Sequence, residues 1–258
     1  MYREKIKVLD CTIRDGGLMN NHDFDFRFVR EVYKAVSGAG IDYMEIGYKN
    51  SKELFSPKEY GAWKFCDDDE IRRVIEGIDS RTKISVMVDI GRVNIDDVKP
   101  ASESPVKMIR VATYVKDIDK AIFMVNHFAE KGYETTINIM AISKDQGVEL
   151  DEALRQIENE SKVNVVYIVD SFGNLYQETT EILVKRFKAI LKTREVGFHG
   201  HNNQQLAFSN TIEAIIHNAN YLDATIYGIG RAAGNCPLEL LMGFLKNPKF
   251  DIRPILDV

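Results

Sequence analysis

Two histidines lie two positions apart at the end of a predicted β-strand, a spacing that can bring both imidazoles to one cation. His199 and His201 flank Gly200. Residues i and i+2 of an extended segment point to the same side. Asp15 follows another predicted strand and would complete a set of two imidazoles and one carboxylate, with positions open for water or substrate. The divalent ions Mn²⁺, Mg²⁺, Co²⁺ and Fe²⁺ suit such a set.

Both features also have simpler interpretations. One histidine could cap the following helix while the other packs against the rim of the fold. Arg14 and Asp15, followed by two glycines, could form a turn with a surface ion pair. Which interpretation holds depends on where the strands place these residues.

Eight short runs rich in β-branched and apolar residues are spread along the chain. Most are continuous apolar stretches, as in parallel strands that are buried on both faces. The predicted strands are Ile6–Cys11, Tyr43–Gly47, Ile84–Val88, Met108–Ala112, Thr135–Ala141, Val165–Asp170, Val196–His199 and Leu222–Ile226.

Helical periodicity fills the gaps between these strands. The predicted helices are Phe26–Val36, Ile118–Lys131, Val148–Ser161, Tyr176–Lys192, Gln204–Asn218 and one that starts near Asn235. Eight β-then-α units in 258 residues predict an α/β fold, a single (β/α)₈ TIM barrel that forms one domain over residues 1–258. A doubly wound sheet is the alternative. In such barrels the chemistry lies at the C-terminal ends of the strands, where both histidines and Asp15 are expected.

The composition excludes several classes of protein. With 34 Lys and Arg against 39 Asp and Glu, the net charge is −5, which lacks the basic excess of a nucleic-acid-binding surface. No apolar run approaches the roughly 20 residues of a membrane span, and the first residues do not resemble a signal peptide. The three cysteines form no Cys-x-x-Cys motif. A reduced, cytoplasmic protein is therefore expected.

Five segments together resemble a known family. The segment 10–16 is similar to the D-x-T-[LI]-R-D-G signature of the DRE-TIM metallolyases, the superfamily of hydroxymethylglutaryl-CoA lyase. The segment 199–202 resembles the H-x-H-N motif of that superfamily, and 44–47 resembles its second strand. The segments 228–230 and 233–239 resemble its G-x-G and G-N-x-P-L-E motifs. The last motif is most similar to that of the 4-hydroxy-2-oxovalerate aldolases.

The resemblance implies a divalent metal cofactor, Mn²⁺ or Mg²⁺ with Co²⁺ as a further option. Asp15, His199 and His201 would be its ligands. Asn235 would lie in the site as a further ligand or as a residue that supports one. Cys236 follows that asparagine, so it does not match the catalytic cysteine of the lyases.

The resemblance also implies roles around the metal. Arg14 would stabilise an enolate oxygen, and Glu45 would orient Arg14 or a metal-bound water. Thr113 and Ser171 would line the substrate pocket.

One position departs from the aldolase pattern. The bacterial aldolases carry a histidine three residues after the metal-binding aspartate, and this chain has Leu18 there. The general base is then His22 on the same loop, a metal-bound hydroxide, or one of the strand-end tyrosines Tyr48 and Tyr114. Leu18 would instead close an apolar wall over the aldehyde end of the substrate, which predicts an aldehyde with an apolar or bulky chain rather than a highly polar one.

These observations predict an enzyme, a metal-dependent (class II type) aldolase. It would cleave or form a carbon–carbon bond in a 4-hydroxy-2-oxo acid to give pyruvate, through its enolate, and an aldehyde. The alternatives are an acyltransferase that condenses acetyl-CoA with a 2-oxo acid, and a barrel that binds metal and 2-oxo acid without catalysis. The expected partner is the small 2-oxo acid, with neither nucleic acid nor membrane. The family implies a homodimer, and a dehydrogenase partner is not implied.

Overall fold

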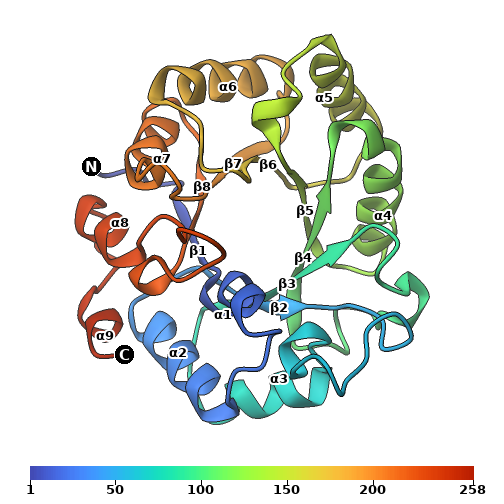
Figure 1. The fold of residues 1–258 in the computed structure, drawn as a ribbon, viewed down its shortest axis with the longest axis vertical. Helices are drawn as coiled ribbons and strands as arrows, with labels where there is room; N and C mark the ends of the chain where they lie inside the picture. The colour runs from blue at the N-terminus through green and yellow to red at the C-terminus, as the bar shows by residue number, and fades with distance from the viewer.

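The computed structural model describes residues 1–258 and shows a closed parallel barrel of eight strands with helices around it (Figure 1). The (β/α)₈ fold predicted from the sequence is confirmed. The strands are β1 (Lys7–Asp10), β2 (Tyr43–Tyr48), β3 (Lys83–Asp89), β4 (Val106–Thr113), β5 (Glu134–Ile139), β6 (Val165–Asp170), β7 (Glu195–Gly200) and β8 (Tyr221–Ala224).

Nine helices accompany the strands, most of them on the outside of the barrel. They are α1 (Thr12–Gly16), α2 (Phe26–Gly38), α3 (Asp68–Ile75), α4 (Ile118–Glu130), α5 (Val148–Glu160), α6 (Gln177–Ile190), α7 (Ala207–Ile216), α8 (Leu238–Phe244) and α9 (Arg253–Leu256).

The barrel closes between its first and last strands. β1 pairs in parallel with β2 on one side and with β8 on the other, where Asp10 lies opposite Ala224. The loops after β1 and β8 therefore meet at the same edge of the barrel, although about 200 residues separate them in the chain.

Helix α2 shows how the local sequence sets an element. The side chain of Asp25 accepts a hydrogen bond from the backbone N–H of Arg27 at 2.8 Å and caps the first turn. Val29, Val32 and Val36 recur at helical spacing and are buried against the barrel. The cap and the apolar stripe together define the start and the orientation of the helix.

The structure differs from the sequence-based predictions mainly in the elements next to the site. The predicted first strand ends one residue earlier, and the segment taken there as a strand end and turn is the short helix α1. The predicted eighth strand stops at Ala224, where a 3₁₀ turn, Ile226–Gly228, begins the site loop. Helix α3 was not predicted because it buries only Ile71 and Val74, too few apolar residues for a clear period.

Two kinds of packing hold the barrel together. A core of 61 buried residues fills the layer between strands and helices. Three small apolar clusters lie apart from this core and include alternate residues of the strands, such as Tyr43 of β2 and Val165 and Tyr167 of β6. Residues at this period face the inside of the barrel, and polar side chains at the same period form the site described below. None of the helices combines the length and the apolarity that spanning a membrane requires.

The inside of the barrel leaves no room for a side chain at Gly197. A Cβ atom there would lie 2.6 Å from the ring of the buried Tyr167. We expect Gly197→Ala to lower the free energy of unfolding by about 1–3 kcal/mol in urea denaturation, because the tyrosine must move within a closed barrel. Gly243→Ala is the matched control, since a Cβ there meets nothing within 4 Å in helix α8. That variant should be neutral or slightly more stable. Equal effects of both substitutions would contradict this account of the barrel interior.

Candidate active site

The first functional residues are placed by the short helix α1. Thr12 donates a hydrogen bond to Asp10 at 2.5 Å, and its hydroxyl accepts one from the backbone N–H of Ile226 at 2.9 Å. These bonds tie the loop after β1 to the loop after β8. Burial raises the pKa of Asp10 to about 7 despite the bonds from Thr12. The helix that follows carries Arg14 and Asp15, both buried, into the mouth of the barrel, so they do not form a surface turn.

Asp15, His199 and His201 converge in this mouth. One ligand atom from each lies within 4.8 Å of the others, and all three residues are buried. The two imidazole rings are 5.2 Å apart between centroids and inclined by 79°. The set has the composition and spacing of a divalent-cation site with two imidazoles and one carboxylate.

Hydrogen bonds orient both imidazoles. Nδ1 of His199 bonds to Oδ2 of Asp223 at 2.9 Å, and Nδ1 of His201 bonds to the backbone oxygen of Gly234 at 3.2 Å. Each ring therefore uses Nδ1 for support and keeps Nε2 for a metal ion, the arrangement that fixes a metal-binding tautomer. The carboxylate of Asp15 is held by the amide of Asn235.

The protonation states suit a cation. Burial lowers the pKa of His201 to about 3, aided by the charges of His199, Arg231 and Arg14, so this imidazole is neutral at physiological pH. Burial alone would raise the pKa of Asp15, but Arg14 and the two histidines lower it below its ordinary value. A neutral imidazole and an ionised carboxylate are the ligand forms that metal ions require.

A bound cation would also account for a buried polar atom that has no hydrogen-bond partner. Oδ1 of Asn235 is buried without a hydrogen-bond partner, an unfavourable state for an acceptor that a nearby cation would relieve. Gly230 packs against the pair formed by this asparagine and Asp15, where a Cβ would collide with Oδ2 of Asp15 at 2.7 Å. A second group, Cys11 with His199 and Asp223, is less suitable. Burial raises the pKa of the Cys11 thiol, and the bond between the other two occupies Nδ1.

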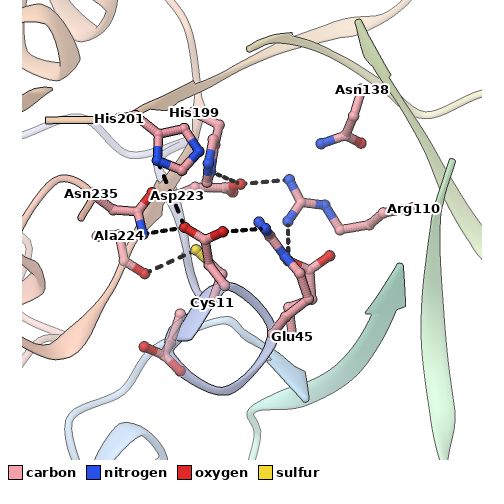
Figure 2. A network of polar contacts seen from close by, with 12 residues as sticks. Cys11, Glu45, Arg110, Asn138, His199, His201, Asp223, Ala224 and Asn235 are labelled. Carbon is pink, nitrogen blue, oxygen red and sulfur yellow. Dashed lines mark hydrogen bonds and ion pairs between the residues drawn. The ribbon is translucent and has the colours of Figure 1, made fainter. Parts of the chain in front are cut away.

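A buried chain of alternating charges links Asp15 to His199, two members of the candidate metal-binding set. Figure 2 labels four residues of this chain: Glu45, Arg110, Asp223 and His199. Arg14 donates to Asp15 through Nη1 at 2.9 Å and to Glu45 through Nε at 2.6 Å. Arg110 donates to the same oxygen of Glu45 at 3.0 Å and to Asp223 at 2.6 Å. We call this the charge network: its members are Asp15, Arg14, Glu45, Arg110, Asp223 and His199.

A cavity of about 100 Å³ opens directly above the metal-binding set. Its polar side holds Arg14, Asp15, both histidines and Arg231, and its other side is largely apolar. The apolar side is lined by Leu18, Tyr48, Met87, Ala112, Met140 and Val169, with Asn138 and Ser171 at its edge.

Five predicted site residues do not line this cavity. Two of them, Glu45 and Asn235, bond to the lining residues Arg14 and Asp15, and the other three lie elsewhere. His22 is buried, its ring packs edge-on against Tyr48 at 5.2 Å, and burial together with Lys64 and Arg14 lowers its pKa to about 3. Thr113 follows the inward-facing residue 112, so strand alternation points it away, and its hydroxyl donates to backbone oxygens. Tyr114 lies beyond the strand and is exposed.

The sequence analysis missed three charged residues of the site. Arg110 lies in the middle of an otherwise apolar predicted strand, and Asp223 follows the first residue of another. A charge inside a buried strand requires a buried partner, and this signal could have indicated both residues. Arg231 gives no such signal, because it lies in a polar loop where an arginine is unremarkable.

Comparisons with known proteins fit this geometry. The model of the HMGL-like family matches residues 5–257. The chain belongs to the HMGL-like family. It is 32% identical over 254 residues to the 4-hydroxy-2-oxovalerate aldolase of Thermus thermophilus, covering 97% of this chain and 72% of that enzyme. It is 29% identical over 245 residues to the oxaloacetate decarboxylase of Mycobacterium tuberculosis, covering 95% and 71%. The resemblance drawn from the sequence motifs is thereby confirmed.

Two solved structures show the same fold. The N-terminal domain of a Bacteroides vulgatus protein assigned as an aldolase superposes with a TM-score of 0.82 at 30% identity, covering 98% of this chain and 84% of that one. Hydroxymethylglutaryl-CoA lyase from Pseudomonas aeruginosa gives a TM-score of 0.77 at 18% identity, covering 99% and 91%. The second likeness concerns the fold alone.

Removal of Arg110 should destabilise the barrel more than a surface substitution does, because Arg110→Met leaves the buried carboxylates of Glu45 and Asp223 without the cation that they share. We expect the free energy of unfolding at pH 7 to fall by about 3–5 kcal/mol in urea titration. The deficit should shrink toward pH 5, because the carboxyls that lose Arg110 gain raised pKa values in the folded variant and take up protons before those of the unfolded chain.

Lys162→Met is the matched control. It removes the exposed ion pair with Glu130, which contributes less than about 1 kcal/mol. A loss from Arg110→Met as small as that of the control would show that the charge network does not support the fold.

Proposed function

We propose that this HMGL-like protein is a divalent-metal-dependent aldolase that cleaves a 4-hydroxy-2-oxo acid to pyruvate and an aldehyde. The observation that carries the proposal is the convergence of Asp15, His199 and His201 beside Arg14 at the floor of one cavity. Mn²⁺ or Mg²⁺ suits this set, and when bound it would polarise the keto oxygen of the substrate as a Lewis acid.

Arg14 is positioned to stabilise the enolate. In the cleavage step the C3–C4 bond breaks, C4 becomes the aldehyde carbonyl, and the electron pair moves through C3 to the oxygen on C2. The Nε and Nη1 groups of Arg14 bond to Glu45 and Asp15, whereas Nη2 has no partner within the protein. Because Arg14 lines the cavity, this N–H group is available to the oxygen on which negative charge develops.

Tyr48 is the titratable residue of the cavity lining that is neither a proposed ligand nor a cation. Its hydroxyl makes no hydrogen bond within the protein, and burial raises its pKa above the ordinary value for tyrosine. Tyr48 therefore holds its proton at neutral pH and is suited to donate a hydrogen bond to the C4 oxygen and orient it. In the overall reaction the hydroxyl on C4 loses a proton and C3 gains one, so the two transfers balance.

The apolar side of the cavity supports a small, apolar aldehyde half. Leu18 and Val169 belong to this side, and so do the clustered side chains of Met87 and Met140. None of these groups can hydrogen-bond a hydroxylated chain, so a polar aldehyde would lose its hydration without compensation.

The proposal is tested by pyruvate release from 4-hydroxy-2-oxopentanoate after chelation and readdition of Mn²⁺. We expect turnover to depend on the metal, and the double variant His199→Ala/His201→Ala to lose both metal binding and turnover. His127→Ala is the control, since this half-buried histidine of helix α4 lies outside the site and belongs to no group of possible metal ligands. Full metal content in the double variant would rule out the proposed ligands.

The identity of the products distinguishes an aldolase from a decarboxylase or an acyltransferase. The similarity to an oxaloacetate decarboxylase makes oxaloacetate the second substrate to test, with carbon dioxide released in place of an aldehyde. A reaction that requires acetyl-CoA would indicate an acyltransferase instead.

Arg14→Lys tests the stabilisation of the enolate. A lysine keeps a positive charge between Asp15 and Glu45 but loses the planar set of donors, so kcat should fall by about two orders of magnitude. Mn²⁺ affinity should stay within a few-fold of that of the wild type, and the melting temperature should fall less than in Arg110→Met. A large drop in melting temperature with unchanged kcat would show that Arg14 is structural.

A further inference from the structure

The loop after β8 holds Arg231 at the metal-binding set. The preceding residue, Gly230, packs against Asp15 and Asn235 so closely that a Cβ atom would lie 2.7 Å from the aspartate oxygen. The backbone N–H of Gly234 donates to the carbonyl of Arg231 at 3.0 Å and closes a turn. The start of the arginine side chain is therefore fixed beside the site, although the residue itself is exposed.

The guanidinium of Arg231 reaches over the histidines. Its Nη2 donates to the backbone oxygen of Ser171 at 2.7 Å and lies 3.4 Å from Nε2 of His201. This nitrogen is the atom that His201 keeps for a metal ion, because its Nδ1 bonds to Gly234. Arg231 thus spans from the loop after β8 to the loop after β6, directly next to the open side of the cation site.

Arg231 differs from Arg14 in its charge balance. Arg14 is paired with two carboxylates, whereas Arg231 forms no ion pair in the protein. A guanidinium is always protonated and repels a divalent cation a few ångströms away. A carboxylate placed between them would attract both charges, and the planar guanidinium fork matches a carboxylate well.

We infer that Arg231 binds the carboxylate of the 2-oxo acid and thereby couples the binding of substrate to the binding of the metal. Without an anion, Arg231 weakens metal binding, and with an anion present the two cations bind it together. By thermodynamic linkage the metal must raise the affinity for the anion by the same factor. This inference rests on the proposed function, because it requires the cation to be bound by Asp15, His199 and His201.

The coupling is measured by titrating the protein with Mn²⁺, with and without saturating oxalate, by calorimetry. Oxalate is a dianion with the shape of the pyruvate enolate. We expect oxalate to increase the Mn²⁺ affinity of the wild type by about tenfold or more. In Arg231→Met, Mn²⁺ alone should bind about three- to tenfold more tightly, and the increase with oxalate should fall at least about fivefold.

Two further variants make the result specific. Arg231→Lys keeps the charge and should retain the weaker binding of Mn²⁺ alone, while it recovers only part of the coupling. Arg253→Met, a change at an exposed arginine of helix α9 paired with Asp251, should match the wild type in both titrations. Equal coupling in the wild type and Arg231→Met, with metal bound in both, would overturn the inference alone. A wild type that binds no Mn²⁺ would overturn the proposed function as well.

Discussion

The charge network beneath the cavity is the constraint on which the rest of the site depends. Two guanidinium groups and three carboxylates are removed from water inside the barrel, and each ion would be strongly unfavourable alone. Their alternation along the network gives every charge an opposite neighbour. The network connects β2, β4, β7 and β8 to the helix after β1, so its members also hold five separate segments at fixed positions.

The charges of this network explain why a cation suits the site. Arg14 and Arg110 do not fully balance Asp15, Glu45 and Asp223, so one negative charge remains beside the two imidazoles. A divalent ion would turn the excess negative charge into an excess positive one, which then favours an anionic substrate. The net charge of the network therefore favours binding of a metal ion first and then of an anionic 2-oxo acid at the same site.

The two sides of the cavity divide the chemistry. The charged and candidate metal-binding side chains come from helix α1, the end of β7 and the loops after β7 and β8, and the lining residues from β2 to β6, together with Leu18, form a mostly apolar side. Low polarity on that side strengthens the electrostatic effect of Arg14 on a developing enolate, because less water screens it. Residues at the ends of the strands thus combine to make one reactive pocket on a rigid barrel.

The sequence by itself determined the fold class and the three residues that converge as the candidate metal-binding set. Eight buried strands separated by helical patterns predict the barrel, and the spacing of His199 and His201 requires only an extended backbone. Only the tertiary structure decided which residues surround that set. Arg110 comes from β4, whereas Asp223 and Arg231 come from β8 and the loop after it. Their roles depend on how closure of the barrel brings these segments together with β1 and β7. The position of His22 was also decided by tertiary packing. Sequence distance places it near Asp15, but its ring packs against that of the buried Tyr48 and does not line the cavity.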